Sequence, residues 1–337
     1  MNVRKSKKSV KKKSKIKFII SFILFQMVFT GITAPFLAYY GPFENVRNTL
    51  VTTAMTTLSH QWIAELFLSK ETINKILKEQ AVTNLSQKKD AETEVTVNNK
   101  NDKTIERFEV NSNKFTGYVL IINDPTRVKV GYSEKLELEG QTTSEIAENN
   151  DAIAAVNGGG FTDEATGSLW TGTGAKPTGI IMSNGDPKYN DLSSDDEQRE
   201  VVAITEDGVL LVGNYSLNEL LQHKAKEAVS FGPALIVEGR KAITNGDGGW
   251  GIAPRTAIGQ RKEDGAIILL VIDGRQTNSI GATLKEVQDV LYDYGAYNAS
   301  NLDGGSSSTM YYKGEIINSP SDSLGERAVP SAIYVEK

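Results

Sequence analysis

The sequence of 337 residues contains no cysteine and only two histidines. The lack of cysteine excludes disulfides, thiolate nucleophiles and cysteine-ligated zinc. A Ser-His-Asp hydrolase would need His60 or His223 as its base, and zinc hydrolases usually need two or three histidine ligands. Both histidines fall in helical patterns among polar neighbours, which predicts surface positions. A catalytic function would therefore rely on carboxylates, hydroxyls, amides and arginines.

Acidic residues are absent from residues 1–17, which hold nine of the 37 lysines and arginines. The rest of the chain carries 28 basic and 42 acidic residues, a formal charge of −14. A domain this acidic is a poor partner for nucleic acid. The hydrophobic content of 39% is enough for a packed core, so the composition does not indicate a disordered chain.

An apolar segment, residues 16–40, follows the basic tail of residues 1–15. It is long enough for the roughly 20 residues that cross a bilayer. The basic flank predicts a cytoplasmic tail and an extracytoplasmic remainder. A cleaved signal is the alternative, but cleavage after Ala38 would place Phe36 at position −3, where a small residue is preferred. The sequence favours a single-pass anchor in the cell membrane over secretion after cleavage.

Residues 41–83 are predicted to form a helical stalk. Large apolar residues recur there at helical spacing, namely Leu58, Trp62, Leu66, Ile73, Ile76 and Leu77. The helical pattern, residues 50–80, would suit a stalk, a cap on the main domain or a surface for self-association. Residues 84–104 are polar, and this composition predicts a linker.

From residue 105 the pattern changes to short apolar runs separated by Gly, Asn and Asp. Eight runs read as strands: Tyr118–Ile122, Ala152–Val156, Gly179–Met182, Val201–Ile204, Val209–Val212, Ala234–Val237, Ala266–Ile272 and Ala332–Val335. Three segments read as helices: Thr142–Asn149, Leu217–Lys226 and Thr283–Tyr294. Residues 105–337 are therefore predicted to form a single α+β domain with a mixed sheet and few helices.

One strand–helix–strand unit brings three carboxylates toward the same edge of the predicted sheet. Asp273 follows the strand Ala266–Ile272, Asp303 follows a strand at residues 298–302, and Glu286 lies in the first turn of the intervening helix. The two strands are expected to run parallel and, if they are neighbours, to lie about 5 Å apart. Open sheets commonly place ligands at this carboxyl edge.

Each carboxylate also has a structural interpretation. Asp-Gly is a common turn pair, which would account for Asp273 and Asp303. Thr283 and Glu286 match a capping box, so Glu286 would only cap its helix. Their joint placement favours the functional reading.

Two glycine-rich segments would let the backbone approach a ligand closely. Gly304, Gly305 and Ser306 follow Asp303 and offer free N–H groups and a hydroxyl to an oxyanion or a sugar. The segment Asn157–Phe161 follows the strand Ala152–Val156 and includes Gly158. A flexible turn is the alternative for this second segment.

An arginine and a tryptophan complete the candidates from the residues themselves. Arg255 precedes a predicted strand and would suit a bidentate phosphate contact, although a structural ion pair is the usual role of an isolated arginine. Trp250 ends a glycine-rich segment that reads as a surface loop, and it would alternatively stack on a sugar face.

Five segments resemble, in order, the phosphodiester glycosidases: Asn157–Phe161, Pro254–Gly259, Val271–Arg275, Glu286 on its helix and Asn301–Ser306. This family includes the enzyme that uncovers lysosomal-enzyme glycans, and many bacterial members are known as exopolysaccharide proteins. The resemblance covers residues 105–337. The family often has two aromatic residues after its Asn-Gly pair, whereas here a third glycine precedes Phe161 alone. A third glycine before Ser306 is missing as well. Both differences concern substrate preference more than reaction class.

The resemblance implies hydrolysis of a sugar-1-phosphodiester at the sugar carbon, in a sugar-phosphate glycan or cell-surface polymer. The phosphate leaves as a stable anion, and carboxylates stabilise an oxocarbenium-like transition state. Asp303 or Glu286 would act at the anomeric carbon, and Asp273 would orient sugar hydroxyls or a cation. Arg255 is the first choice for the phosphate.

Arg275 and Arg327 are the second choices for the phosphate. Asn157 and the backbone of residues 304–306 would position the substrate, with Gly158 and Phe161 beside them. No cofactor is required, although Asp, Asn and carbonyl groups would suit a divalent cation such as calcium. The rival functions are a non-catalytic carbohydrate-binding or exopolysaccharide-assembly module, a phosphodiesterase that breaks the P–O bond, and a membrane scaffold that binds a partner through residues 50–80.

Overall fold

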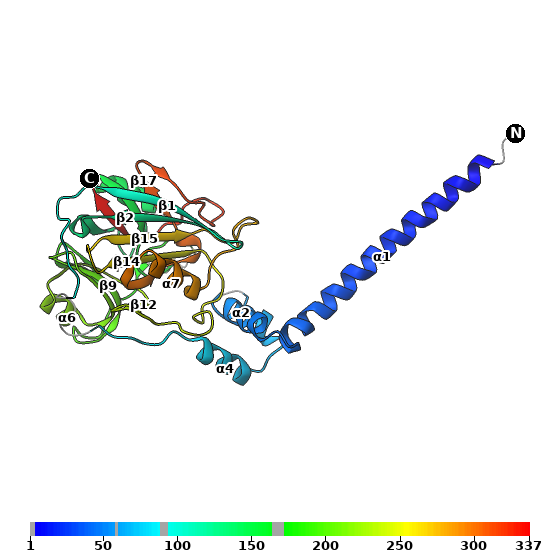
Figure 1. Ribbon diagram of the computed structural model, residues 1–337, viewed down its shortest axis with the longest axis horizontal. Coiled ribbons are helices and arrows are strands. Elements are labelled where there is room, and N and C mark those ends of the chain that lie inside the picture. The colour runs from blue at the N-terminus through cyan, green and yellow to red at the C-terminus, as the bar shows by residue number, and fades with distance from the viewer. Residues whose placement is uncertain (1–3, 58–59, 88–93, 164–171) are drawn as a thin grey trace. The chain divides into compact units, whose positions relative to one another are not determined.

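The computed structural model describes residues 4–57, 60–87, 94–163 and 172–337. The chain forms two compact units, residues 1–78 and 79–337. In the first unit, helix α1 (Arg4–Tyr40) contains a segment, Lys15–Tyr40, that is long and apolar enough to cross a membrane (Figure 1). Its 26 residues have a mean hydropathy of 1.9, and the side chains of its apolar window are not buried by other parts of the protein.

Short helices follow α1 in the first unit. They are α2 (Glu44–Met55), α3 (Trp62–Glu65) and α4 (Lys70–Gln80). Their apolar faces pack together with the end of α1 in a small core that includes Tyr39, Val51, Ala64 and Ile76. The residues predicted as a stalk are therefore helical, but in separate helices. Leu58, part of the predicted pattern, lies outside the described residues.

The second unit is built mainly of antiparallel strands, and its α+β class is confirmed. Among the described residues, the largest sheet has the order β1-β2-β15-β14-β16-β12-β13. The bounds are β1 Ile105–Asn111, β2 Thr116–Ile122, β15 Ile267–Ile272, β14 Arg255–Arg261, β16 Ala296–Leu302, β12 Ala234–Val237 and β13 Arg240–Lys241.

Two further sheets of five described strands complete the domain. One has the order β10-β9-β11-β7-β8: Leu210–Tyr215, Arg199–Thr205, Ala225–Ser230, Ile180–Ser183 and Asp186–Asn190. The other has the order β18-β17-β4-β19-β3: Glu315–Ile316, Met310–Tyr312, Ala152–Asn157, Ser331–Glu336 and Val128–Tyr132. The short strands β5 (Phe161–Thr162) and β6 (Lys176–Pro177) pair with each other.

The remaining helical elements are short. They are η2 (Pro125–Arg127), α5 (Thr143–Asn149), α6 (Leu217–Gln222), α7 (Leu284–Asp293) and η3 (Gly305–Ser307). The predicted helix Leu217–Lys226 is wrong beyond Gln222, because β11 begins at Ala225 and pairs with β9. Sheet pairing decides the structure of this segment over its local pattern.

The continuous apolar run of β15 is explained by burial on both of its faces. Ile267, Leu269 and Val271 join the core shared with the other two sheets. The alternate residues, which include Ile268 and Leu270, join a second core under α7. Because successive strand side chains point to opposite faces, a strand covered on both sides needs apolar residues throughout. Helix α7 therefore lies against the largest sheet, at β12, β14 and β16 (Figure 1).

The predicted strand–helix–strand unit is present, but its two strands are not neighbours. Strands β15 and β16 both pair antiparallel with β14, so they run parallel to each other with β14 between them. The predicted orientation is confirmed and the conditional adjacency is wrong. The third strand comes from residues 255–261, which precede the unit in the chain.

Residues of the predicted linker form hydrogen bonds within the second unit, both before and after residues 88–93. The Gln87 side chain accepts a hydrogen bond from Val212 N at 2.6 Å, and Thr96 N donates to Lys262 O at 3.0 Å. Val95 is buried. Polar composition is thus compatible with fixed structure here, because polar side chains satisfy backbone groups of the domain. The boundary by contacts falls at Glu79, and the separate linker stays a prediction.

Candidate active site

Three strand ends meet at one edge of the largest sheet. In the register of the sheet, Arg255 pairs with Ile272 and Thr256 pairs with Leu302. Strand β14 therefore begins where β15 and β16 end. Asp273 and Asp303, which follow those strands, leave the sheet at the same edge as Arg255. The sequence argument placed the two aspartates correctly, even though a third strand separates them.

Backbone and polar side chains of neighbouring segments hold Asp303 at this edge. Its N–H donates to Gly158 O at 3.2 Å, and its carbonyl accepts a hydrogen bond from Asn157 Nδ2 at 2.6 Å. The residue as a whole is partly exposed. Burial raises the pKa of the Asp303 carboxyl to about 6, although a hydrogen bond from Ser307 and the charge of Arg327 oppose the shift. A carboxylate with this pKa is suited to proton transfer near neutral pH.

Asn157 holds the Asp303 segment from the interior. Its side chain is fully buried. The amide oxygen accepts hydrogen bonds from Thr256 Oγ1 at 2.7 Å and Thr309 N at 3.2 Å, while the amide nitrogen holds Asp303 O. With both ends of the amide occupied, Asn157 acts as a positioning residue. Gly158 beside it has no room for a side chain, because a Cβ would lie 2.7 Å from Ser331 Oγ.

The Gly304–Ser306 segment turns sharply above the sheet edge. Gly305 has φ of +64°, a conformation that favours glycine, and its N–H donates to Pro254 O at 2.9 Å. A Cβ at Gly304 would lie 2.9 Å from the same Pro254 oxygen. The two glycines therefore let this segment pass over the start of β14, and Ser306 follows at the edge.

Arg327 connects Ser306 with the segment after β4. Its Nη1 donates to Ser306 Oγ at 3.0 Å, and its Nη2 forms an ion pair with Asp163 Oδ2 at 2.5 Å. The guanidinium carbon lies 5.0 Å from the centre of the Phe161 ring. Burial alone would raise the pKa of Asp163, but hydrogen bonds from Arg327 and Gly174 lower it below its usual value. Arg327 is thus oriented from three sides and charged.

Arg275 lies beside the same segment. A Cβ on Gly305 would lie 3.3 Å from Arg275 Nη2. Burial lowers the pKa of the Arg275 guanidinium, and the positive charge of Arg327 lowers it further. Within the described part of the chain, no carboxylate forms an ion pair with Arg275. The two cations are close enough for the charge of Arg327 to act on Arg275, and such a pair would suit an anion.

The contacts of Arg255 are structural, which makes it less suited to bind a phosphate. The residue is 4% exposed, and its guanidinium donates to three backbone carbonyls: Nε to Ala282 O at 3.1 Å, and Nη2 to Trp250 O at 2.8 Å and Gly251 O at 2.7 Å. Burial lowers its pKa to about 10. It ties the 250–251 loop and the segment before α7 to β14. Geometry therefore favours Arg275 and Arg327 over Arg255 as anion ligands.

Asp273 is buried and engaged by the chain that follows β17 and β18. Its Oδ1 accepts hydrogen bonds from Asn318 Nδ2 at 3.0 Å and Ser319 N at 2.9 Å. Asn318 also donates to Ser308 O at 3.1 Å. Burial raises the pKa of Asp273, and these hydrogen bonds partly oppose the rise. Asp273 links the end of β15 to the segment that follows Asp303.

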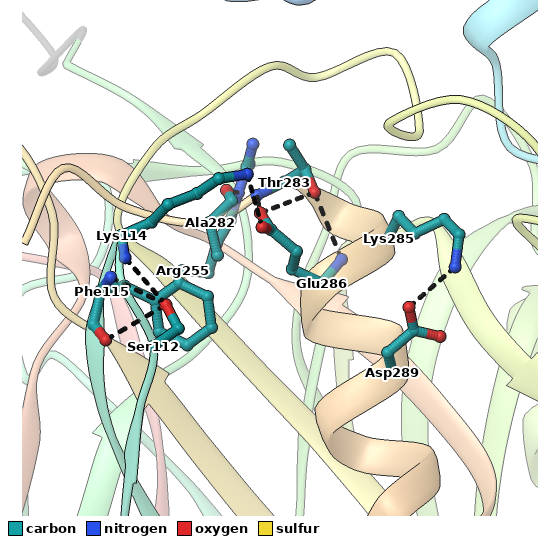
Figure 2. Close-up of polar contacts among 9 residues, drawn as sticks. All are labelled: Ser112, Lys114, Phe115, Arg255, Ala282, Thr283, Lys285, Glu286 and Asp289. Carbon is teal, nitrogen blue, oxygen red and sulfur yellow. Dashed lines mark hydrogen bonds and ion pairs between the residues drawn. The ribbon is translucent and has the colours of Figure 1, made fainter.

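Glu286 caps its helix, as the structural interpretation of the sequence held. Figure 2 shows its carboxylate between Thr283 and Lys114. Oε2 accepts hydrogen bonds from Thr283 N and Oγ1, both at 2.9 Å, and Oε1 pairs with Lys114 Nζ at 2.8 Å. Burial alone would raise the pKa of Glu286, but the bonds from Lys114 and Thr283 lower it. Both oxygens are occupied by structural partners, so a catalytic role for Glu286 loses support.

Replacing Glu286 tests this assignment. E286A removes the capping box and the Lys114 partner, and we expect a loss of about 1 kcal/mol in the free energy of unfolding. E286Q should lose less, since glutamine also completes a capping box. Thermal unfolding of both variants, with turnover measured on the folded protein, checks this. Loss of turnover in E286Q at unchanged stability would make Glu286 a catalytic residue again.

Several residues that contact the site residues have no signal in the sequence. Asp163 and Ser307 touch the charged groups there, and Lys114 neutralises Glu286. Asp163 shares no motif with Arg327, which is 164 residues away, so only the tertiary fold brings them together. In the described ranges, no group of three His, Asp or Glu residues is arranged to hold a metal ion.

A sequence model of the phosphodiester glycosidases matches residues 150–336, more than half of the chain. The chain belongs to this family. All the site residues above except Lys114 lie within the match. The catalytic domain of zebrafish N-acetylglucosamine-1-phosphodiester alpha-N-acetylglucosaminidase, auto-inhibited by its pro-peptide, has a similar fold. It superposes with a TM-score of 0.60 at 24% identity, over 72% of this chain and 86% of that one.

Two curated relatives are longer than this family member. The SPbeta prophage-derived protein YomE of Bacillus subtilis is 28% identical over 220 residues, which cover 63% of this chain and 31% of YomE. The bovine N-acetylglucosamine-1-phosphodiester alpha-N-acetylglucosaminidase is 41% identical over 71 residues, covering 21% of this chain and 13% of that enzyme. The matched regions thus span at most about a third of either relative's length.

The raised pKa of Asp303 predicts a pH-dependent stability difference. The folded pKa, about 6, exceeds the usual value of 3.8, so proton binding stabilises the fold fully below pH 4. This stabilisation is lost as pH rises through about 6. The D303N variant has no such charge, so it should gain stability relative to the original protein between pH 4 and pH 7, by at most about 3 kcal/mol. The unfolding midpoints of both proteins at pH 4 and pH 7 measure this gain. If the stability difference between D303N and the original protein is the same at both pH values, the pKa shift of Asp303 is contradicted.

Proposed function

We propose that this family member is an active hydrolase that cleaves a sugar-1-phosphodiester bond, of the N-acetylglucosamine-1-phosphate type, outside the cytoplasm. One arrangement carries the proposal. The charge of Arg327 acts on Asp303, whose pKa is about 6, and both Arg327 and Arg275 lie beside the Gly304–Ser306 segment that follows it. A carboxylate that acts on carbon and two cations that bind phosphate are the groups such a bond requires. The zebrafish and bovine relatives are N-acetylglucosamine-1-phosphodiester alpha-N-acetylglucosaminidases, which supports the same substrate class.

The reaction needs little from the protein beyond these groups. Arg275 and Arg327 hold the phosphate of the diester and stabilise the charge that develops as the bond from the sugar carbon to the phosphate oxygen breaks. The electron pair of that bond leaves with the phosphomonoester. Asp303, mostly ionised at pH 7, stabilises the oxocarbenium-like sugar carbon, either as a nucleophile or as the base that takes a proton from the attacking water. The hydroxyl of Ser306 and the Gly304–Gly305 backbone line the phosphate side.

The remaining predicted residues hold the site in shape. Asn157 and Gly158 fix the backbone of Asp303, and Asp273 fixes the chain beyond Ser308. Phe161 supports the Arg327 guanidinium. Asp273 would additionally meet sugar hydroxyls or a divalent cation such as calcium, and loss of turnover in EDTA with rescue by calcium would show the latter.

The cellular setting is part of the proposal. Residues 16–40 would anchor the chain in the cell membrane, the basic tail would stay in the cytoplasm, and the domain would face a phosphate-linked glycan or envelope polymer. Trp62 and Leu66 remain exposed on the helices after α1, which keeps self-association through residues 50–80 as a prediction. Protease added outside intact cells should digest the domain while the tail survives.

A labelled-water experiment separates the proposed reaction from its rivals. The full-length chain in detergent would be incubated with N-acetylglucosamine-1-(methyl phosphate) in oxygen-18 water. Incorporation of the label into the sugar shows cleavage of the C–O bond, as proposed. Incorporation into phosphate shows a phosphodiesterase. Binding of the diester without turnover shows a carbohydrate-binding module.

A further inference from the structure

The helices that follow α1 carry large apolar side chains that the rest of the first unit leaves uncovered. Phe43, at the N-cap of α2, is exposed together with Val46 and Leu50. These positions are three and four residues apart in the chain, so they share one face of α2. Trp62 and Leu66, four residues apart at α3, are 58% and 68% exposed. Together, these five residues are the exposed apolar set of the first unit.

Other sides of the same helices are already buried in the small core of this unit. Val51 and Ala54 of α2 and Ala64 of α3 pack there with Tyr39 from the end of α1. The exposed apolar set is therefore additional to the core, and both helices are apolar on more than one side. Such helices need a second apolar surface to cover them, from another protein or from a membrane.

Aromatic contacts hold the end of α3 against the end of α1. The ring centre of Phe67 lies 4.7 Å from that of Tyr39 and 5.7 Å from that of Phe36. The Tyr40 hydroxyl also donates to Phe67 O. Helix α2 lies at the same end of α1 (Figure 1). Since Leu66 directly precedes Phe67, the exposed apolar set begins beside this end of α1.

The length of α1 determines which layer of a membrane this end would reach. Lys17 is the last charged residue of the helix, and the apolar run continues to Tyr40. At about 1.5 Å per residue, about 20 residues cross a hydrocarbon core of about 30 Å. With α1 spanning the bilayer, as proposed, a count from Phe18 places residues 36–40 at the headgroup boundary. The contacts with Phe67 hold Leu66 at the same depth.

Residue type and charge fit an interfacial position for these helices. Tryptophan is enriched where a membrane meets water, and amphipathic helices lie in that layer with their apolar faces turned to the acyl chains. Residues 41–78 contain four basic and three acidic residues, a formal charge of +1. A segment this close to neutral gains little from anionic lipids, so burial of apolar side chains would supply the attraction.

We propose that the exposed apolar set inserts into the extracytoplasmic face of the membrane that α1 crosses, with α2 and α3 lying in the interface. The inference rests on the proposed anchoring and extends it, because the chain then meets the bilayer along a surface as well as through one helix. Lipid is already present at this depth, whereas a second copy of the chain would have to be recruited to cover the same residues. Interfacial anchors of this kind also set the tilt of a spanning helix.

The lack of cysteine in the chain allows a direct measurement, since an introduced cysteine is then unique. The full-length chain would be reconstituted in phosphatidylcholine vesicles with a nitroxide on L66C, V28C or N74C. Power-saturation EPR gives the depth of each label from its collisions with oxygen, which concentrates in lipid, and with a nickel chelate, which stays in water. We expect the L66C label about 5–10 Å inside the headgroup boundary. The V28C label in α1 should lie near the bilayer centre, and the N74C label, on an exposed position of α4, should lie in water.

The three labels separate the inference from the proposed anchoring. A V28C label in lipid with an L66C label in water overturns the inference and leaves the anchoring intact. Spin–spin broadening at L66C, with poor access to both reagents, shows that a second copy covers the surface, which also overturns the inference. A V28C label in water shows that the proposed anchoring itself fails.

Removal of other members of the set gives a second test. With the label at L66C, W62S together with V46S should raise its collision rate with the nickel chelate at least about twofold, because less apolar area is buried. N45S, at an exposed polar position of α2, is the matched control and should leave the rate unchanged. An unchanged rate in the double variant, or entry of the label only into vesicles with anionic lipid, would overturn an apolar contact. Circular dichroism shows that each variant is folded, and V46C replaces L66C as the label site, with W62S alone, if L66C unfolds.

Discussion

The D303N variant is expected to lose about 10³-fold in kcat on a sugar-1-phosphodiester while it remains folded. Asparagine keeps the size of the side chain and the backbone bonds to Asn157 and Gly158, but it has no negative charge for the sugar carbon and cannot accept a proton from water. The loss therefore isolates the chemical role of the carboxylate. Single-turnover kinetics with the methyl diester measures it, because product release then does not contribute.

The pH profile adds an independent check of the same residue. With a pKa of about 6, Asp303 is protonated below that value, so kcat/KM should rise with pH through about 6 and level off near neutrality. E286Q is the matched control, since it makes the same chemical change in a carboxylate whose oxygens are held by Thr283 and Lys114. If D303N keeps near-normal turnover, another group must act on the sugar carbon and the assignment is lost.

The second large effect is expected at Arg275. R275A removes a guanidinium that has no carboxylate partner in the described chain, so we expect kcat/KM to fall by about 10²-fold with little loss of stability. R275K keeps the charge without the planar fork, and it should recover only part of the activity. The inhibition constant of inorganic phosphate should rise in parallel, since phosphate binds the same cations.

Two comparisons decide whether this loss is specific to the phosphate. R240A removes an exposed arginine on β13 and should leave kcat/KM unchanged. R327A should lower turnover as well, but it also breaks the pair with Asp163 and leaves that carboxylate without its cation, so stability falls with it. Unchanged phosphate inhibition in both R275A and R327A would show that the anion binds elsewhere.

Local sequence pattern was sufficient to place the two aspartates at one edge. The apolar run before Asp273 is continuous because β15 is buried on both faces, and this property is visible in the sequence. The order of the strands cannot be predicted from local sequence, because β14 lies between β15 and β16 only through pairing in the folded sheet. The spacing of Thr283 and Glu286 also predicts the capping box. The bond from Glu286 to Lys114 spans 172 residues and could not be predicted from local sequence.

The roles of the arginines show where sequence reasoning ends. Arg255 and Arg275 lie in recognisable motifs, and Arg327 lies outside them. Nothing in those motifs says whether a guanidinium meets solvent or backbone carbonyls. Arg255 is enclosed by the 250–251 loop, whereas Arg275, with φ of +59°, stays beside the Gly304–Ser306 segment.

The position of Asn157 has a consequence for the folding and unfolding of the protein. It belongs to β4 in one five-stranded sheet, and its amide joins Thr256 and Asp303 of the largest sheet across as many as 146 residues of chain. The proposed reacting centre thus lies where two sheets meet, and neither sheet contains it alone. A nascent or partly unfolded chain would therefore not hydrolyse the substrate. In denaturant, hydrolysis should be lost at the same concentration at which the two sheets separate. Turnover would then report the fraction of fully folded protein.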